Sequence, residues 1–191
     1  MNILVTGASK GIGNAIAHEL QNIGEVFVTG RNKKALIECN AKGFCVCDLS
    51  KDITTLTDFI EKNNIDVLIN NAGEYIYSDL DKMNIKDIQR LYQTNLIAPA
   101  FLASKVIPNM KNKKWGRIIN IGSISGVMGE AYASIYSSSK AGLIGLTKAL
   151  ALELAEHNIT VNTINPGWVE TELGMASIDD SEFSREEIVE T

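Results

Sequence analysis

Tyr136 and Lys140 are separated by three serines, so a phenol and an ammonium group stand four residues apart. In a helix, positions four apart share one face, and the two side chains can reach the same small volume. A free phenol, whose pKa is about 10, ionises too rarely at neutral pH to act as acid and base in turn. A fixed cation beside it favours the phenolate, so this pair suits proton transfer.

The pair by itself does not decide between catalysis and chance. The chain has five tyrosines and fourteen lysines, so an incidental pair on a surface helix would look the same. The elements that hold Tyr136 and Lys140, and the other motifs along the chain, must distinguish the two interpretations.

The composition fits one globular domain over residues 1–191, with 45% hydrophobic and 21% charged residues. The net charge of −5 and the lack of a dense basic patch argue against a nucleic-acid partner. The first residues carry no basic region, and their apolar run is too short for a signal peptide or membrane span. We therefore expect a cytoplasmic protein with no membrane partner. The three cysteines and two histidines lack metal-ligand spacing, so we also expect no metal site.

Short apolar runs of strand type alternate with helical patterns along the chain. The predicted strands cover residues 2–6, 25–29, 44–47, 66–70, 117–121 and 160–164. The predicted helices cover residues 12–23, 33–41, 53–62, 85–106 with a kink at Pro99, and 134–157. Nearly continuous apolar strands separated by helices predict an α/β fold with a doubly wound parallel sheet of the Rossmann type. Such a fold has three α/β/α layers and binds ligands beyond the carboxyl ends of its strands.

A glycine-rich turn follows the first predicted strand and leads directly into a helix. It carries Gly7, Gly11 and Gly13. Glycines let the backbone turn tightly and approach a pyrophosphate, while the helix N-terminus offers amide donors and positive potential. The flanking strand and helix favour a dinucleotide-binding loop over the alternative, a tight turn without a ligand.

The end of the second predicted strand indicates which dinucleotide is bound. An acidic side chain there would hydrogen-bond the adenosine ribose of NAD, whereas a basic group suits the extra phosphate of NADP. The sequence has no carboxylate at this point; Arg31 stands there, and Lys10 lies in the glycine loop near the same ribose. These two cations predict a preference for NADP(H) over NAD(H). The alternative is that both are solvated surface charges.

Six motifs, in order and spacing, resemble those of the short-chain dehydrogenase/reductase family. They are Thr6-Gly7-x-x-x-Gly11-x-Gly13, Asn70-Asn71-Ala72-Gly73, Asn95, Ser123, Tyr136-x-x-x-Lys140 and Pro166-Gly167. Ser123 follows Asn95 by 28 residues and precedes Tyr136 by 13, as in the tetrad of that family. The resemblance covers essentially the whole chain, and the joint occurrence of the motifs sets chance aside for Tyr136 and Lys140.

The resemblance implies a catalytic tetrad of Asn95, Ser123, Tyr136 and Lys140. Tyr136 would protonate a carbonyl oxygen as hydride arrives from the nicotinamide, or take the alcohol proton in the reverse direction. Ser123 would hold the substrate oxygen. Lys140 would lower the pKa of Tyr136 and bond the nicotinamide ribose, and Asn95 would position a water that connects Lys140 to solvent.

The resemblance also implies which residues line the cofactor. Asp48 would lie beside the adenine with Leu49 next to it, and Pro166 to Thr171 would pass the nicotinamide. The full set is Gly7, Ser9, Lys10, Gly11, Ile12, Gly13, Arg31, Asp48, Leu49, Asn71, Ala72, Gly73, Tyr136, Lys140, Pro166, Gly167, Val169 and Thr171.

Two further expectations concern the end of the chain and the subunits. Family members continue past the segment that begins at Gly167 with further helices and a last strand, so we expect that this chain, which stops at Thr191, is truncated and lacks that strand. Residues 172–191 would form an acidic lid over the substrate, or a solvated segment. The family forms dimers and tetramers through its long helices, so we expect a homo-oligomer with residues 85–106 and 134–157 as interface candidates.

The stretches that begin at Ser123, Lys140 and Pro166 resemble the 3-oxoacyl-[acyl-carrier-protein] reductase branch and its acetoacetyl-CoA reductase relatives. This implies NADPH-dependent reduction of a 3-oxoacyl thioester, as in fatty acid biosynthesis. Four basic residues could receive the anionic carrier, or form an ordinary solvated turn: Lys111, Lys113, Lys114 and Arg117. Three residues after Ser123 are expected to line the substrate pocket: Met128, Glu130 and Tyr132.

Two alternatives stay open at this point. One is a dehydrogenase of sugars, polyols, steroids or 3-hydroxybutyrate with the same catalytic machinery. The other is a noncatalytic protein that senses the redox state of the dinucleotide. The intact tetrad argues against a sensor, because a sensor does not need Tyr136 and Lys140 in catalytic register.

Overall fold

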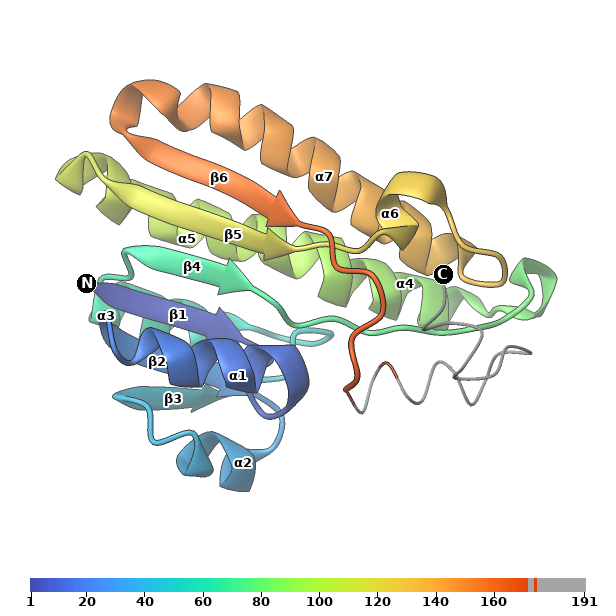
Figure 1. The fold of residues 1–191 in the computed structure, drawn as a ribbon, viewed down its shortest axis with the longest axis horizontal. Helices are drawn as coiled ribbons and strands as arrows, with labels where there is room; N and C mark the ends of the chain where they lie inside the picture. The colour runs from blue at the N-terminus through green and yellow to red at the C-terminus, as the bar shows by residue number, and fades with distance from the viewer. Residues whose placement is uncertain (172–173, 175–191) are drawn as a thin grey trace.

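A computed structural model describes residues 1–171 and Gly174. Within these residues, six strands form one sheet in the order β3-β2-β1-β4-β5-β6, and all neighbours run parallel (Figure 1). The strands are β1 (Asn2–Thr6), β2 (Glu25–Gly30), β3 (Gly43–Val46), β4 (Val67–Asn70), β5 (Gly116–Ile121) and β6 (Ile159–Ile164). This is the strand order of a Rossmann sheet, as the sequence predicts.

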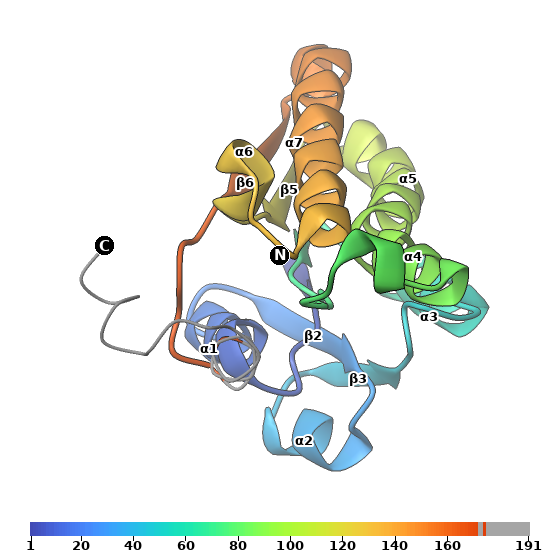
Figure 2. The same cartoon turned by 90° about the vertical axis from the view of Figure 1, so that its right-hand side faces the viewer.

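Helices cover both faces of the sheet and give three layers (Figure 2). One face carries α1 (Gly11–Leu20) and α2 (Lys33–Glu38); the other carries α3 (Thr54–Asn63), α5 (Ala98–Lys113) and α7 (Ser134–Leu154). The shorter elements are η1 (Leu80–Lys82), α4 (Ile85–Tyr92), the π-helical turn η2 (Gln93–Ile97), α6 (Ser125–Met128) and η3 (Ala155–His157).

The central strands β1, β2 and β4 are apolar on both sides because each side faces a helical layer, whereas the edge strands β3 and β6 have one exposed face. In β1, Ile3 and Val5 belong to the core cluster under α1 and α2, whereas Leu4 belongs to the cluster under the opposite helices. Phe27 and Val28 divide in the same way on β2. Successive side chains of a strand point to opposite faces, so a doubly covered strand is a continuous apolar run in the sequence.

The single helix predicted over residues 85–106 differs from the structure in its end and in its continuity. It is divided into α4, the π-helical turn and α5, and α5 continues to Lys113. Pro99 lies in the first turn of α5, directly after the π-helical turn, and the kink expected there stays a prediction. Pro108 lies inside α5 and is exposed, as is Ser104, so water can reach the carbonyl that loses its hydrogen bond.

The chain reverses its direction of winding at β1, which has β2 on one side and β4 on the other. The glycine loop after β1 and the segment after β4 therefore border one crevice at the carboxyl edge of the sheet. This is where ligands bind in open α/β sheets.

Three expectations from the sequence concern a membrane span, a metal site and a lid. In residues 1–171 and Gly174, no helix is both long and apolar enough to cross a bilayer. The same residues contain no group of three or more His, Cys, Asp or Glu side chains placed to hold a metal ion. The predicted lid, residues 172–191, lies outside the described residues apart from Gly174.

Candidate active site

A cleft of about 1390 Å³ opens at the carboxyl ends of the strands. Of the site residues expected from the sequence, all but Asn95 line it. The cleft begins at the glycine loop, passes the ends of β2 and β3, and continues to the start of α7. Residues from the whole length of the sequence thus meet in one cavity.

The glycine loop needs its glycines for two different reasons. Gly7 and Gly11 have φ angles of +67° and +54°, which side chains rarely adopt. A Cβ at Gly7 would also lie 2.7 Å from the Cα of Ala72, and one at Gly13 would collide with the Asn71 amide. The loop therefore packs directly on the segment after β4, and α1 begins at Gly11 with its N-terminus at the cleft.

Hydrogen bonds join the ends of β1 and β4 beneath this loop. The Thr6 hydroxyl accepts bonds of 3.0 Å from the amides of Asn71 and Ala72, and the Asn71 side chain donates to the Thr6 carbonyl at 2.9 Å. Asn71 borders the cleft, and its side-chain nitrogen donates to the carbonyls of Thr6 and Gly7, which holds the glycine loop in place.

Arg31 lies at the mouth of the cleft and forms an ion pair that the sequence analysis did not foresee. Its Nη1 is 3.2 Å from Oε1 of Glu74, whose Oε2 is 3.1 Å from Nη1 of Arg90. Arg31 is thus not a purely solvated charge, and a phosphate that binds it must compete with Glu74. The only sequence signal for Glu74 is its position directly after Gly73.

Asp48 borders the cleft after β3, as expected. Its Oδ1 accepts hydrogen bonds from the Ser50 amide at 3.1 Å and the Ser50 hydroxyl at 2.7 Å. Burial alone would raise the pKa of Asp48, but these bonds and the charges of Lys51 and Arg31 outweigh it and lower the pKa. The carboxylate is therefore held in place as an acceptor.

Tyr136 and Lys140 share one face of α7, and the Lys140 Nζ is 5.7 Å from the centre of the Tyr136 ring. Lys140 is 4% exposed and donates to the Ile121 carbonyl at 2.8 Å, and burial lowers its pKa to about 8. The expected lowering of the Tyr136 pKa by Lys140 is not seen. Burial raises that pKa, a hydrogen bond with Ser123 lowers it, and the Glu130 charge raises it further.

Asn95 lies in the π-helical turn, 1% exposed, behind the wall of the cleft. Its side chain accepts from the amide of Glu74 and donates to the carbonyl of Glu74, both at 2.8 Å, and donates to Ser139 Oγ at 3.1 Å. Asn95 thereby holds the loop after β4. The water proposed from the family resemblance stays a prediction.

Glu130 lines the cleft, as expected from the sequence, and so do Met128 and Tyr132. Tyr75 also lines it, a residue that no motif indicated. Its ring lies edge-on to Tyr136, with centroids 4.9 Å apart, and its hydroxyl donates to Glu130 at 2.7 Å.

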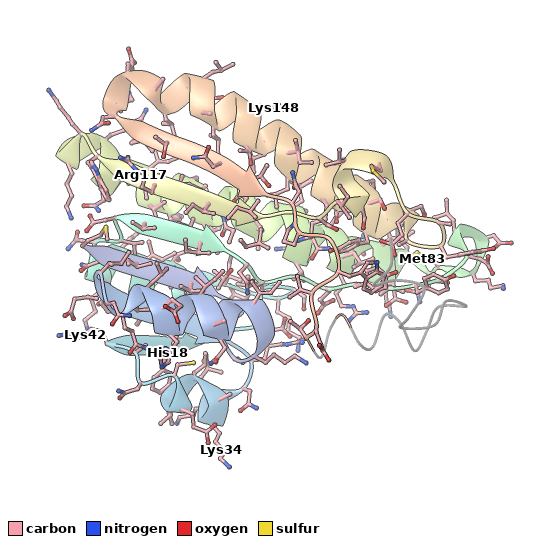
Figure 3. The ribbon with its side chains drawn as sticks, in the orientation of Figure 1. His18, Lys34, Lys42, Met83, Arg117 and Lys148 are labelled. Atoms are coloured by element: carbon pink, nitrogen blue, oxygen red, sulfur yellow. The ribbon has the colours of Figure 1, made fainter. Side chains whose placement is uncertain are left out.

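The basic residues expected to receive a carrier lie at the wrong end of the sheet. Arg117 is on β5 near its amino end, and Figure 3 shows it far from Met83, at the opposite end of the molecule. Lys113 pairs with Asp66, and the Arg117 guanidinium lies 4.6 Å from the Trp115 ring. The cleft opens at the carboxyl ends of the strands, away from this cluster, which argues against these residues as the carrier surface.

Residues 1–182 match the family described as short chain dehydrogenase. The chain belongs to the short-chain dehydrogenase family. It is 38% identical to 3-oxoacyl-[acyl-carrier-protein] reductase FabG of Escherichia coli (strain K12) over 93% of this chain and 77% of that protein. A variant of actinorhodin polyketide ketoreductase with NADPH superposes with a TM-score of 0.86 and 34% identity, over 97% of this chain and 78% of that one. For 4-hydroxyisoleucine dehydrogenase complexed with NADH, the TM-score is 0.86 and the identity 33%, over 94% and 78%.

A short-chain dehydrogenase binds a nicotinamide dinucleotide, and residues of this chain fit one. Gly7 and Gly13 let the loop pack tightly on the segment after β4, so that the N-terminus of α1 opens on the cleft, where its amides suit a pyrophosphate. The Ser9 Oγ is buried at the loop and has no hydrogen-bond partner among the described residues. An orphaned polar atom of this kind is normally satisfied by a ligand or water. This member of the family is therefore an oxidoreductase of alcohol and carbonyl groups.

Proposed function

We propose that the protein is an NADPH-dependent carbonyl reductase and that its substrate is a 3-oxoacyl thioester. One observation carries the reaction type: Ser123, Tyr136 and Lys140 converge in the cleft that begins at the glycine loop. When bound, the nicotinamide cofactor supplies the hydride. Family membership favours this enzyme over the redox sensor.

The side chains have complementary roles in the proposed reaction. Tyr136 donates its phenolic proton to the carbonyl oxygen, and its raised pKa keeps that proton in place at neutral pH. Ser123 lines the same cleft and would hold the same oxygen. The buried Lys140 ammonium provides positive charge next to the phenolate that forms.

Arg31 supports NADPH over NADH, because it follows β2 where a carboxylate would otherwise select the free ribose hydroxyl. Lys10 adds a second basic residue on the wall of the cleft. The test is the dissociation constant of each cofactor for wild type and for Arg31→Ala. We expect a loss of about tenfold for NADPH, since one charge-assisted phosphate contact is removed, and little change for NADH. Lys34→Ala on α2, an exposed lysine outside the cleft, is the matched control.

The thioester assignment rests on the 3-oxoacyl-[acyl-carrier-protein] reductase relative named above. Its test is oxidation of NADPH, followed by absorbance, with acetoacetyl-CoA or a 3-oxoacyl carrier thioester. We expect turnover that Tyr136→Phe abolishes. If NADPH binds but neither thioester is turned over, the thioester class is wrong. The 4-hydroxyisoleucine dehydrogenase neighbour then favours alcohol oxidation, to be assayed with sugars, polyols, steroids and 3-hydroxybutyrate.

We further propose a cytoplasmic homo-oligomer, a dimer or tetramer, built on one domain with a lid at residues 172–191. The long helices leave apolar side chains exposed: Ile97, Phe101 and Leu152. Leu152 is 82% exposed on α7, which suits a helix that packs on a second subunit. Light scattering after gel filtration tests this, and Leu152→Glu is expected to shift the mass toward the monomer.

A further inference from the structure

A closed ring of contacts surrounds the reacting end of the cleft. Ser123 Oγ donates to Ser125 Oγ at 3.0 Å, and Ser125 Oγ donates to Glu130 Oε2 at 2.6 Å. The other carboxylate oxygen, Oε1, accepts from the Tyr75 hydroxyl at 2.7 Å. The Tyr75 ring then meets Tyr136, and Ser123 lies close enough to the Tyr136 phenol to lower its pKa.

The carboxylate decides the direction of every hydrogen bond in this ring. An ionised carboxylate only accepts, so the Ser125 hydroxyl must donate to Glu130 and therefore accepts from Ser123. Ser123 has one hydrogen, and Ser125 receives it. The Ser123 oxygen also accepts from the Ser125 amide at 3.1 Å, which leaves it one lone pair toward Tyr136. In this arrangement the protonated Tyr136 is the donor, and when Tyr136 ionises the Ser123 hydroxyl can turn toward the phenolate, which is how their interaction lowers the pKa of Tyr136.

We propose that Glu130 is a positioning residue that orients Ser123 through Ser125 and Tyr136 through Tyr75, so that Tyr136 is kept as a proton donor. Glu130 does not need to touch the reacting oxygen for this role. One of its oxygens holds Tyr75, whose ring meets Tyr136, and the other holds Ser125, which accepts from Ser123. Its negative charge opposes the phenolate. The inference rests on the proposed role of Tyr136 in the reaction.

Other titratable groups besides Glu130 lie near the Tyr136 phenol. Lys140 lies on the same helix, and Tyr75 and Tyr77 lie in the loop after β4. The Glu130 charge raises the pKa of Tyr136, whereas Lys140, whose own pKa is lowered to about 8, is largely neutral at the pH where this phenol ionises. Removal of the Glu130 charge is therefore expected to lower the pKa of Tyr136.

The test compares three variants that separate the charge from the hydrogen bonds. Glu130→Gln removes the charge and keeps the size, Ser125→Ala breaks the link to Ser123, and Tyr75→Phe breaks the other link while keeping the ring. The readout is the pH dependence of kcat/KM for alcohol oxidation, which requires the phenolate. We expect Glu130→Gln to lower the midpoint of this pH dependence by about 1 pH unit, since the removal of one nearby charge has an effect of that order. Ser125→Ala and Tyr75→Phe should lower kcat and leave the midpoint near that of wild type.

Glu153→Gln on α7 is the matched control, because Glu153 is exposed and lies outside the cleft. It should change neither the midpoint nor the activity. The proposal is overturned if Glu130→Gln loses activity with an unmoved midpoint, or if Glu153→Gln moves the midpoint as far.

A second measurement needs no substrate. The phenolate absorbance of Tyr136 is titrated as the difference between each protein and the same protein carrying Tyr136→Phe. A downward shift in the Glu130→Gln background supports the proposal even when no thioester is turned over. If the titration shifts and no thioester is turned over, only the proposed substrate class is overturned. An unchanged titration would overturn the role of Glu130 whatever the substrate is.

Discussion

Arg31 and Glu74, 43 residues apart in the chain, form an ion pair at the mouth of the cleft with 3.2 Å between Nη1 and Oε1. Arg31 is 65% exposed on its side chain and Glu74 only 13%. The carboxylate is therefore the fixed partner, and Arg90 holds its other oxygen. An anion that binds Arg31 must compete with Glu74.

Glu74→Gln is expected to strengthen NADPH binding relative to NADH. Removal of the competing charge frees Arg31 for the 2′-phosphate. Because the Arg31 end of the ion pair is largely exposed, the pair is weak, and we expect a gain of about two- to fivefold in the affinity ratio. Fluorescence titration with both cofactors measures it. Equal changes for NADPH and NADH would show that Arg31 does not bind the phosphate.

Lys140 should give the protein a characteristic dependence of stability on pH. Burial lowers its pKa from 10.5 to about 8. Between these values the unfolded chain binds a proton that the folded chain has released, so the free energy of unfolding rises with pH. Relative to Lys140→Met, wild type should gain on the order of 2 kcal/mol between about pH 7.5 and 9.5.

Urea unfolding of both proteins across this pH range measures the gain. Lys148→Met removes an exposed lysine from the same helix and serves as the control (Figure 3). A difference between wild type and Lys140→Met that stays constant with pH would contradict the depressed pKa.

Gly7→Ala should destabilise the protein and abolish dinucleotide binding. The new Cβ would lie 2.7 Å from the Cα of Ala72, on a backbone with φ of +67°. We expect a loss of about 2–3 kcal/mol in the free energy of unfolding. Gly145→Ala on α7 is the opposite case, because a Cβ there meets nothing within 4 Å. It should stabilise the helix by about 0.5–1 kcal/mol, and equal effects of both variants on denaturant midpoints would refute this account.

The double variant Lys111→Ala, Lys114→Ala should leave KM for a thioester substrate unchanged within about twofold, because charges more than a Debye length from the site are screened. Both residues lie at the end of α5 that leads into the amino end of β5, away from the cleft. A steady-state assay with acetoacetyl-CoA tests this. A rise in KM of about tenfold or more would place the carrier on this surface after all.

Several features follow from the sequence alone, because local patterns determine them. Apolar runs covered on both faces predict the strands, and Asn2–Thr6 is predicted to the residue. Gly7 and Gly13 indicate a phosphate loop because strand and helix flank them, and helical spacing places Tyr136 and Lys140 on one face. Family membership agrees with the motif order that the sequence carries.

The tertiary structure alone decides which side chains meet across the cleft. Tyr75 and Glu130 are 55 residues apart, and Arg31 and Glu74 are 43 apart, so no periodicity relates them. Asn95 holds the loop at Glu74 only because a π-helical turn directs its side chain there. Hydrogen bonds form over about 3 Å, and such distances depend on how strand ends and loops pack against each other. Local sequence determines the elements, whereas packing determines the contacts between their ends.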